Sequence, residues 1–293
     1  MRVSAASLVF AGLLAGLPAA APSRAPVPGF ARVQVGPAGG TVWKGTVPGE
    51  SAGARGRPTF VYLPPGYSPS RRYPVAYLLH GMPGGPTSYV YSLHLAERAD
   101  ALIASGRTRP FIAVCPPAGT HHGYYSGEWA GVWEDYLVRR VVPWVDTNLP
   151  TVASAAGRVL AGLSAGGFGA VSIGLRHLGV FGVLESWSGY FHPFADGPLA
   201  HADRAVLDRH DPTLLVRRKA AAVRRLGVRF ELSTGVAHGA ITPALTAAFA
   251  RELASFGLPV AVWHVPASVR TPDYGDQLTH GLAFAFAPPA HAG

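Results

Sequence analysis

The sequence predicts an α/β fold with a mostly parallel central sheet that is covered by helices on both faces. Short apolar runs alternate with segments whose apolar residues recur at helical spacing, which is typical of strands alternating with helices. The run Val75–Leu79 is wholly apolar, as expected of a strand buried on both faces. Composition agrees with a globular fold, since 48% of the residues are hydrophobic and only 14% are charged.

The order of the elements places an antiparallel segment before the alternating one. We expect a hairpin from Val33 to Val47 and a strand at Thr59–Leu63, each ended by Gly or Pro residues. Apolar runs predict later strands at Val75–Leu79, Phe111–Cys115, Val159–Leu163, Val183–Ser188, Val228–Ser233 and Val260–Val265. Helical spacing predicts helices at Leu93–Ala104, Ala165–Leu178, Pro212–Arg225 with Asp211 as N-cap, Pro243–Phe256 and Asp276–Phe286.

A further helix is predicted between the strands at Phe111–Cys115 and Val159–Leu163. Its apolar face consists of Trp133, Leu137, Val141 and Trp144. Pro143 lacks a backbone N–H, so we expect an irregularity there. No internal repeat and no second domain are evident.

The first 32 residues differ in composition from the rest. Residues 1–21 combine a basic start, a short apolar run and an Ala-rich cleavage site, which predicts a secretory signal peptide. The apolar run is too short for a comfortable membrane span, and no later segment is a transmembrane candidate. Residues 22–32 are expected to form a disordered Pro-rich linker, followed by a single domain at residues 33–293. We therefore expect a secreted or cell-envelope protein.

The net charge is +9, and nearly all of the basic residues are Arg. No nucleic-acid-binding motif accompanies this charge, so a nucleic-acid partner is disfavoured. The segment around Arg217 to Arg225 is basic, and a solvated helix face is favoured over recognition of an anionic polymer or lipid. Cys115 is the only cysteine and lies in an apolar run, which predicts a buried side chain and not a catalytic thiol.

One motif carries the chemistry. Gly162-Leu163-Ser164-Ala165-Gly166 follows a predicted strand and opens a predicted helix, the setting in which a Gly-x-Ser-x-Gly turn exposes a nucleophilic serine. Such a serine needs an oxyanion hole, and one donor is expected to be the backbone N–H of Ala165. The glycine-rich loop His80-Gly81-Met82 ends another buried strand, and the N–H of Met82 is the predicted second donor. His80 itself is expected to be structural.

Four stretches together resemble the esterase D-type α/β-hydrolase family: YLLHGMPGG, GEWAGVWEDYLVRRVVPWVD, LAGLSAGGFGAVSIGLRH and FGVLESWSGYF. The family includes S-formylglutathione hydrolases, feruloyl esterases and secreted mycolyltransferases, and the similarity extends from about residue 40 to the C-terminus. The resemblance implies an α/β-hydrolase fold with Ser164 as nucleophile and with Met82 and Ala165 as the oxyanion hole. It also implies hydrolysis of carboxylic esters, or acyl transfer to an alcohol.

The acid and base of the usual triad do not stand where the resemblance places them. A carboxylate is expected three residues after Gly235, where this chain has His238. The family histidine aligns with Val269. One hypothesis is a migrated base, in which His238 serves Ser164 and is oriented by Asp273 or Asp276.

Three further hypotheses address the same two positions. In the first, His264 or His280 serves as the base, although His264 lies in a predicted strand and His280 in a predicted helix. In the second, the alignment of the last loop is displaced. In the third, the protein is a catalytically impaired pseudo-hydrolase that binds a ligand or associates with the cell wall. In triad hydrolases, loss of the base lowers kcat by about 10⁶-fold, so an active and an impaired hydrolase should differ greatly in turnover.

The segment from Gly119 to Trp129 follows a strand near the expected active-site edge. Its side chains His121, His122, Tyr124 and Trp129 are candidates for binding a sugar or an acyl chain, and Trp129 is alternatively a support of the loop. Adjacent histidines rarely share one ion and no third ligand is evident, so no metal or cofactor is expected. The predicted partner is a small-molecule, lipid or glycan ester.

Overall fold

A computed structural model describes residues 25–48, 57–119, 126–235, 241–266 and 274–289. These residues form a nine-stranded sheet in the order β1-β2-β3-β5-β4-β6-β7-β8-β9. The strands are β1 (Ala31–Val35), β2 (Thr41–Gly45), β3 (Thr59–Leu63), β4 (Val75–Leu79), β5 (Ile112–Cys115), β6 (Arg158–Leu163), β7 (Val183–Trp187), β8 (Arg229–Thr234) and β9 (Val260–His264).

The pairing of the strands confirms the antiparallel start and the parallel remainder. β1, β2, β3 and β5 pair in antiparallel fashion, whereas all pairs from β5 through β4, β6, β7 and β8 to β9 are parallel. The carboxyl ends of the parallel strands therefore meet at one edge of the sheet, which is where α/β folds place their ligands.

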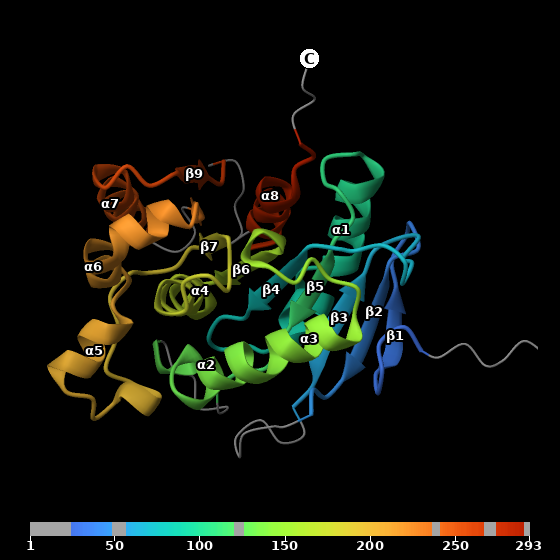
Figure 1. Ribbon diagram of the computed structural model, residues 1–293, viewed down its shortest axis with the longest axis horizontal. Coiled ribbons are helices and arrows are strands. Elements are labelled where there is room, and N and C mark those ends of the chain that lie inside the picture. Colours follow the sequence, from blue (N-terminus) through green and yellow to red (C-terminus); the bar gives the residue numbers. More distant parts are fainter. Residues whose placement is uncertain (1–24, 49–56, 120–125, 236–240, 267–273, 290–293) are drawn as a thin grey trace, which may run out of the picture.

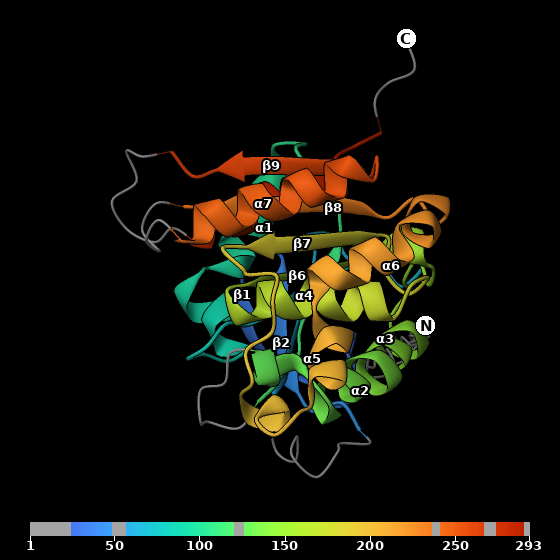
Figure 2. The same cartoon turned by 90° about the vertical axis from the view of Figure 1, so that its left-hand side faces the viewer.

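Helices cover both faces of the sheet, as the sequence predicts (Figures 1 and 2). One face carries α1 (Leu95–Ala104) and α8 (Tyr274–Phe286). The other face carries the remaining helices, α2 (Val132–Tyr136), α3 (Val142–Asn148), α4 (Ala165–Arg176), α5 (Arg204–His210), α6 (Pro212–Arg225) and α7 (Ile241–Ser255). No helix in these residues is both long and apolar enough to cross a membrane.

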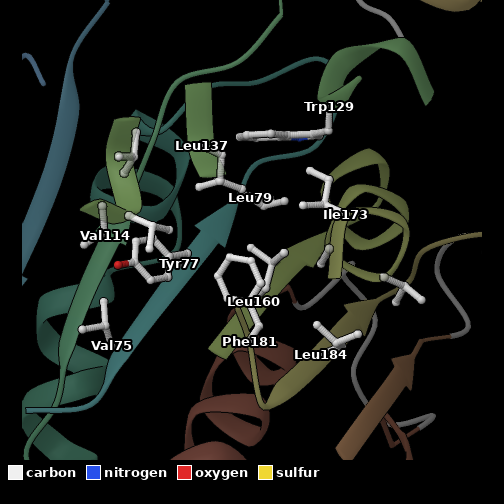
Figure 3. Packing of buried hydrophobic residues seen from close by; sticks show 14 of the residues in the cluster. Val75, Tyr77, Leu79, Val114, Trp129, Leu137, Leu160, Ile173, Phe181 and Leu184 are labelled. Carbon is white, nitrogen blue, oxygen red and sulfur yellow. The ribbon is translucent and has the colours of Figure 1, made fainter. Parts of the chain in front are cut away.

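Period-two alternation divides each central strand between two apolar clusters. Val75, Tyr77 and Leu79 of β4 point to the α4 face, and the intervening Ala76 and Leu78 point to the α1 and α8 face. Figure 3 shows the first three packing with side chains of neighbouring strands and helix α4. Both faces of β4 are thus removed from water, which explains its continuous apolar run.

The irregularity predicted at Pro143 lies one turn earlier. A π-helical turn at Leu137–Val141 joins α2 to α3, and Pro143 follows it in the first turn of α3. Helix α5 was not predicted, because the apolar residues of Arg204–His210 form one short run and no stripe at helical spacing.

The linker predicted at residues 22–32 needs correction over its described part. Val27 is fully buried, and Phe30 stacks on Trp144 with ring centroids 5.1 Å apart. Strand β1 begins at Ala31, inside the expected linker. Two apolar side chains thus anchor this segment to α3, a contact that its proline-rich composition did not reveal.

Candidate active site

Ser164 occupies the sharp turn between β6 and α4. Its backbone φ of 53° and ψ of −116° lie in a region that non-glycine residues rarely adopt. Such a conformation costs about 1–3 kcal/mol and persists only where the surroundings enforce it. Here the Ser164 N–H donates to the carbonyl of Trp187 at 2.8 Å, and its own carbonyl accepts from the first turn of α4.

The turn is possible because small residues surround it. A Cβ on Gly162 would overlap the carbonyl group of Gly166, and one on Gly166 would overlap the carbonyl group of Leu79. The backbone of α4 consequently approaches β4 and β6 more closely than any side chain would allow. This close approach explains the two glycines of the Gly-x-Ser-x-Gly motif.

The loop after β4 lies directly against the nucleophile. A Cβ placed on Gly81 would come within 3.2 Å of the Ser164 Cβ, so the chain leading into Met82 passes beside the serine. Ala165 begins α4, and the first N–H groups of a helix have no acceptor within it. The structure thus brings together the two segments that carry the predicted oxyanion donors Met82 and Ala165.

His80 holds this loop and does not serve as a base. Its Nε2 accepts from the N–H of Ala118 at 3.1 Å, so the proton resides on Nδ1, which donates to the carbonyl of Gly81 at 3.1 Å. Burial lowers the pKa of His80 to about 4, which keeps the ring neutral. The structural role expected from the sequence fits this arrangement.

Trp129 supports the same loop from the other side. Its side chain is buried at 2% exposure, its indole N–H donates to the carbonyl of His80 at 2.9 Å, and it packs above Leu79 and Ile173 (Figure 3). The expectation that Trp129 contacts a ligand is therefore not supported, because little of its surface is accessible. The alternative role as a support of the loop agrees with the contacts.

A buried polar network fastens the carboxyl end of β7. Gln277 of α8 is fully buried, and its Oε1 accepts from the hydroxyls of Ser188 at 3.1 Å and Ser233 at 3.2 Å. The Ser188 N–H donates to the carbonyl of Ser233 at 2.7 Å. Since Ser188 follows Trp187, whose carbonyl accepts from Ser164, this network supports the turn of the nucleophile. The network was not predicted, and its signal in the sequence is a single polar residue on the apolar face of α8.

Two of the candidate bases lie far from Ser164. His264 is exposed at the end of the edge strand β9, and β9 stands three strand spacings, or about 14 Å, from β6. His280 stacks on Trp263 of the same edge strand with ring centroids 4.4 Å apart. Neither histidine is placed to accept the proton of Ser164.

The remaining site predictions fall outside the described residues. These are the candidate base His238, the substituted position Val269, the orienting residue Asp273 and the ligand candidates His121, His122 and Tyr124. Asp276, the other candidate for orienting His238, lies 3.4 Å from Arg98 Nη1 through its Oδ1.

No metal or thiol chemistry is indicated by the part of the chain that the structure describes. It contains no group of three or more His, Cys, Asp or Glu side chains arranged to hold a metal ion. Cys115 is buried in β5, and burial raises the pKa of its thiol well above the usual value. The described residues place Ser164 at a sharp turn beside the loop that leads into Met82.

Comparisons with known proteins agree with this geometry. Residues 52–254 match the family model described as "Putative esterase". An esterase of Mycobacterium tuberculosis strain H37Rv is 36% identical over 135 residues, which cover 44% of this chain and 28% of the relative. An endo-1,4-beta-xylanase/feruloyl esterase of Xylanibacter ruminicola is 36% identical over 137 residues, covering 44% of this chain and 19% of the relative. The match thus spans less than a third of either curated relative.

Solved structures share the fold at lower identity. A ferulic acid esterase superposes with a TM-score of 0.69 at 22% identity, covering 84% of this chain and 98% of that one. An S-formylglutathione hydrolase from Agrobacterium tumefaciens superposes with a TM-score of 0.64 at 16% identity, covering 87% and 97%. With the family match over most of the chain, these similarities show that the protein belongs to the esterase family of the α/β-hydrolase fold.

Proposed function

We propose that the protein is a carboxylic-ester hydrolase that works through an acyl-enzyme on Ser164. The observation that carries the proposal is the enforced positive φ of Ser164 at the start of α4. In the proposed reaction the Ser164 Oγ attacks the ester carbonyl, and the N–H groups of Ala165 and Met82 stabilise the resulting oxyanion. The alcohol then leaves with a proton, and water releases the acid from the serine.

Labelling with a fluorophosphonate tests the nucleophile. We expect the wild-type protein to be labelled stoichiometrically and Ser164→Ala to remain unlabelled, with hydrolysis of a p-nitrophenyl ester lost in parallel. The proposal is wrong if both proteins label equally poorly. A matched control is Ser172→Ala, since Ser172 lies on the same helix and its hydroxyl is bonded to the carbonyl of His210, away from Ser164.

We further propose that His238 is the base. The distant positions of His264 and His280 support this choice over the alternatives. His238→Ala should lower kcat by at least about 10²-fold, the usual contribution of general-base catalysis. His264→Ala, which changes an exposed histidine on β9, should leave kcat unchanged. Unaltered turnover in His238→Ala would contradict the assignment.

The second candidate function is a catalytically impaired hydrolase that binds an ester or associates with the cell wall. The observation that favours it is the pair of substitutions at the usual acid and base positions, His238 and Val269. An oxyanion hole without a base leaves about 10³–10⁴ of rate enhancement over water. Saturable binding of an ester with no turnover and no labelling would identify this function.

The substrate and the location belong to the same proposal. Similarity to ferulic acid esterases makes small aromatic carboxylic esters the first substrates to test, with lipid and glycan esters next. Product analysis in the presence of an alcohol would separate hydrolysis from acyl transfer. We propose secretion through residues 1–21, with release to the medium or retention at the cell envelope, and fractionation of cells producing the full chain tests it.

A further inference from the structure

A cavity of about 280 Å³ lies on the helical face that is turned toward the viewer in Figure 2. Its walls come from α5, α6, α7 and the segment after β7, and not from β6 or the loop after β4, which form the nucleophile's surroundings. The lining residues are Phe191, His192, Arg204, Asp211, Thr213, Leu214, Arg217, Leu245, Ala248, Phe249 and Glu252. Its volume lies just below the usual range of about 300–1,000 Å³ for ligand pockets, so it suits a small ligand.

The inner part of this cavity is apolar. Phe191 and Phe249 stack with ring centroids 4.0 Å apart and an interplanar angle of 10°. Leu214, Leu245 and Ala248 extend this surface along α6 and α7. Because Phe191 and Phe249 are each only 2% exposed, the accessible apolar surface is that of Leu214, Leu245 and Ala248. A hydrocarbon body can be buried against it, with a gain of about 25 cal/mol for each Å² removed from water.

The basic and acidic side chains that line the cavity differ in their exposure to solvent. The basic side chains face solvent, since Arg204 is 81%, Arg217 54% and His192 64% exposed. The carboxylates are less exposed, since the side chain of Asp211 is 7% and that of Glu252 21% exposed. The mouth therefore presents positive charge to an approaching ligand.

The carboxylates are also occupied by the protein itself. Asp211 accepts from the N–H of Leu214 at 2.9 Å and from His192 Nδ1 at 2.8 Å. Glu252 accepts from Nε and Nη2 of Arg217 at 2.6 and 3.2 Å. A guanidinium carries five N–H donors, so Arg217 retains donors beyond these two. Arg204 contacts Asp208 at 2.7 Å, an exposed pair of the kind worth only about 0–1 kcal/mol, which a ligand can replace.

We propose that this cavity is a second binding site, separate from Ser164, for a small carboxylate with an apolar body. The apolar body lies against Leu214 and Leu245, and the carboxylate accepts hydrogen bonds from Arg204 and Arg217. Of the basic residues on α6, the site uses Arg217. It holds whether or not the serine is catalytically active.

Calorimetric titration of the full chain with sodium octanoate tests the proposal. We expect saturable binding of one octanoate per chain. Octanol lacks the carboxylate and acetate lacks the alkyl chain, so each should bind at least tenfold more weakly. Absence of octanoate binding would overturn the site. Equal affinity for octanol would overturn the role of the arginines.

Substitutions locate the bound octanoate. The double variant Arg204→Gln, Arg217→Gln should weaken binding at least tenfold, and Ala248→Trp should block the exposed entrance on α7. Arg225→Gln is the matched control, since it changes an exposed arginine on the same helix that does not line the cavity, and it should bind as the wild type does. Binding that disappears in Ser164→Ala would place octanoate at the nucleophile and contradict the proposal. Circular dichroism of each variant verifies that it is folded.

Discussion

At the scale of single residues, the conformation of Ser164 depends on partners far away in sequence. Its N–H donates to the carbonyl of Trp187, and Ser188, which follows, is itself held at a φ of 50°. Gln277 accepts from the hydroxyls of Ser188 and Ser233 and so joins α8 to the ends of β7 and β8. The strained turn at Ser164 is thereby supported by an amide on the opposite face of the sheet.

Gln277→Met removes this acceptor while keeping a side chain of similar length. Two buried hydroxyls lose their partner, and we expect the free energy of unfolding to fall by about 1–3 kcal/mol. Fluorophosphonate labelling of Ser164 should slow as well, because the turn that presents the serine is less firmly held. Urea unfolding and the labelling rate constant are the measurements.

A matched control separates positioning from general destabilisation. Leu282→Val trims a buried side chain on the same helix, away from the network, and is expected to cost about 1 kcal/mol. Its labelling rate should equal that of the wild type. If Gln277→Met labels as fast as Leu282→Val, the network is structural only.

At the scale of elements, α5 and α6 begin with the same device. Asp203 accepts from the N–H of Val206 at 2.7 Å, and Asp211 accepts from the N–H of Leu214 at 2.9 Å. Each carboxylate satisfies one of the free N–H groups at a helix start and interacts favourably with the helix dipole. The two caps differ in burial, since Asp211 is buried and Asp203 is exposed.

The two caps should therefore differ in their contribution to stability. Asp203→Ala is expected to lower the free energy of unfolding by about 0.5–1 kcal/mol, and Asp211→Ala by about 1–3 kcal/mol because a buried N–H and His192 both lose their partner. Denaturant unfolding measures both losses. Asp211→Asn keeps an acceptor at the cap and should recover part of the difference. Equal losses in the two alanine variants would contradict the importance of burial.

At the scale of the whole molecule, two glutamates are buried between the sheet and α8. Glu185 and Glu231 occupy adjacent positions on β7 and β8. Burial raises the pKa of Glu231 to about 8, and burial together with the neighbouring Glu231 raises the pKa of Glu185 well above its usual value. His280 Nε2 lies 3.8 Å from Glu231 Oε1, too far for a hydrogen bond, and burial lowers the pKa of His280.

These pKa shifts make stability depend on pH. Between about 4.5, the ordinary value of a glutamate, and about 8 the folded chain holds protons that the unfolded chain releases. The contribution is therefore fully present below about pH 4.5 and is lost as pH rises through about 8. We expect the free energy of unfolding to fall with pH in this window, by up to about 1.4 kcal/mol per pH unit for each proton.

Urea unfolding across this pH range measures the effect. Glu231→Gln replaces the titrating group with a neutral one of the same shape and should flatten the slope. Asp135→Asn, which removes an exposed carboxylate on α2, should leave the slope as it is in the wild type. A slope as steep in Glu231→Gln as in the wild type would assign the pH dependence to other groups.

The regular elements were largely predictable because their signals are local. The strand Val75–Leu79 is apolar at every position, and the helix Pro212–Arg225 has an Asp cap and a proline at its start, so both agree with the structure to the residue. Helix α5 has only a short apolar run and no stripe at helical spacing, and packing against α6 and α4 stabilises it. The buried Val27 and Phe30 were missed for a related reason, since the α3 residue on which Phe30 stacks is more than a hundred residues away along the chain.

The sequence by itself determined the fold class, the family and the position of the serine turn, because glycine spacing, apolar runs and helix caps act between near neighbours. Only the tertiary structure chose between the two roles considered for Trp129 and revealed the role of Gln277, since each makes hydrogen bonds to residues from other elements. It also placed His264 on the edge strand β9, where strand order and not sequence position sets the distance to Ser164, and it stacked His280 of α8 on Trp263 of the same strand. The cavity between α5, α6 and α7 exists for the same physical reason, because its apolar floor and cationic mouth come from segments that only folding brings together.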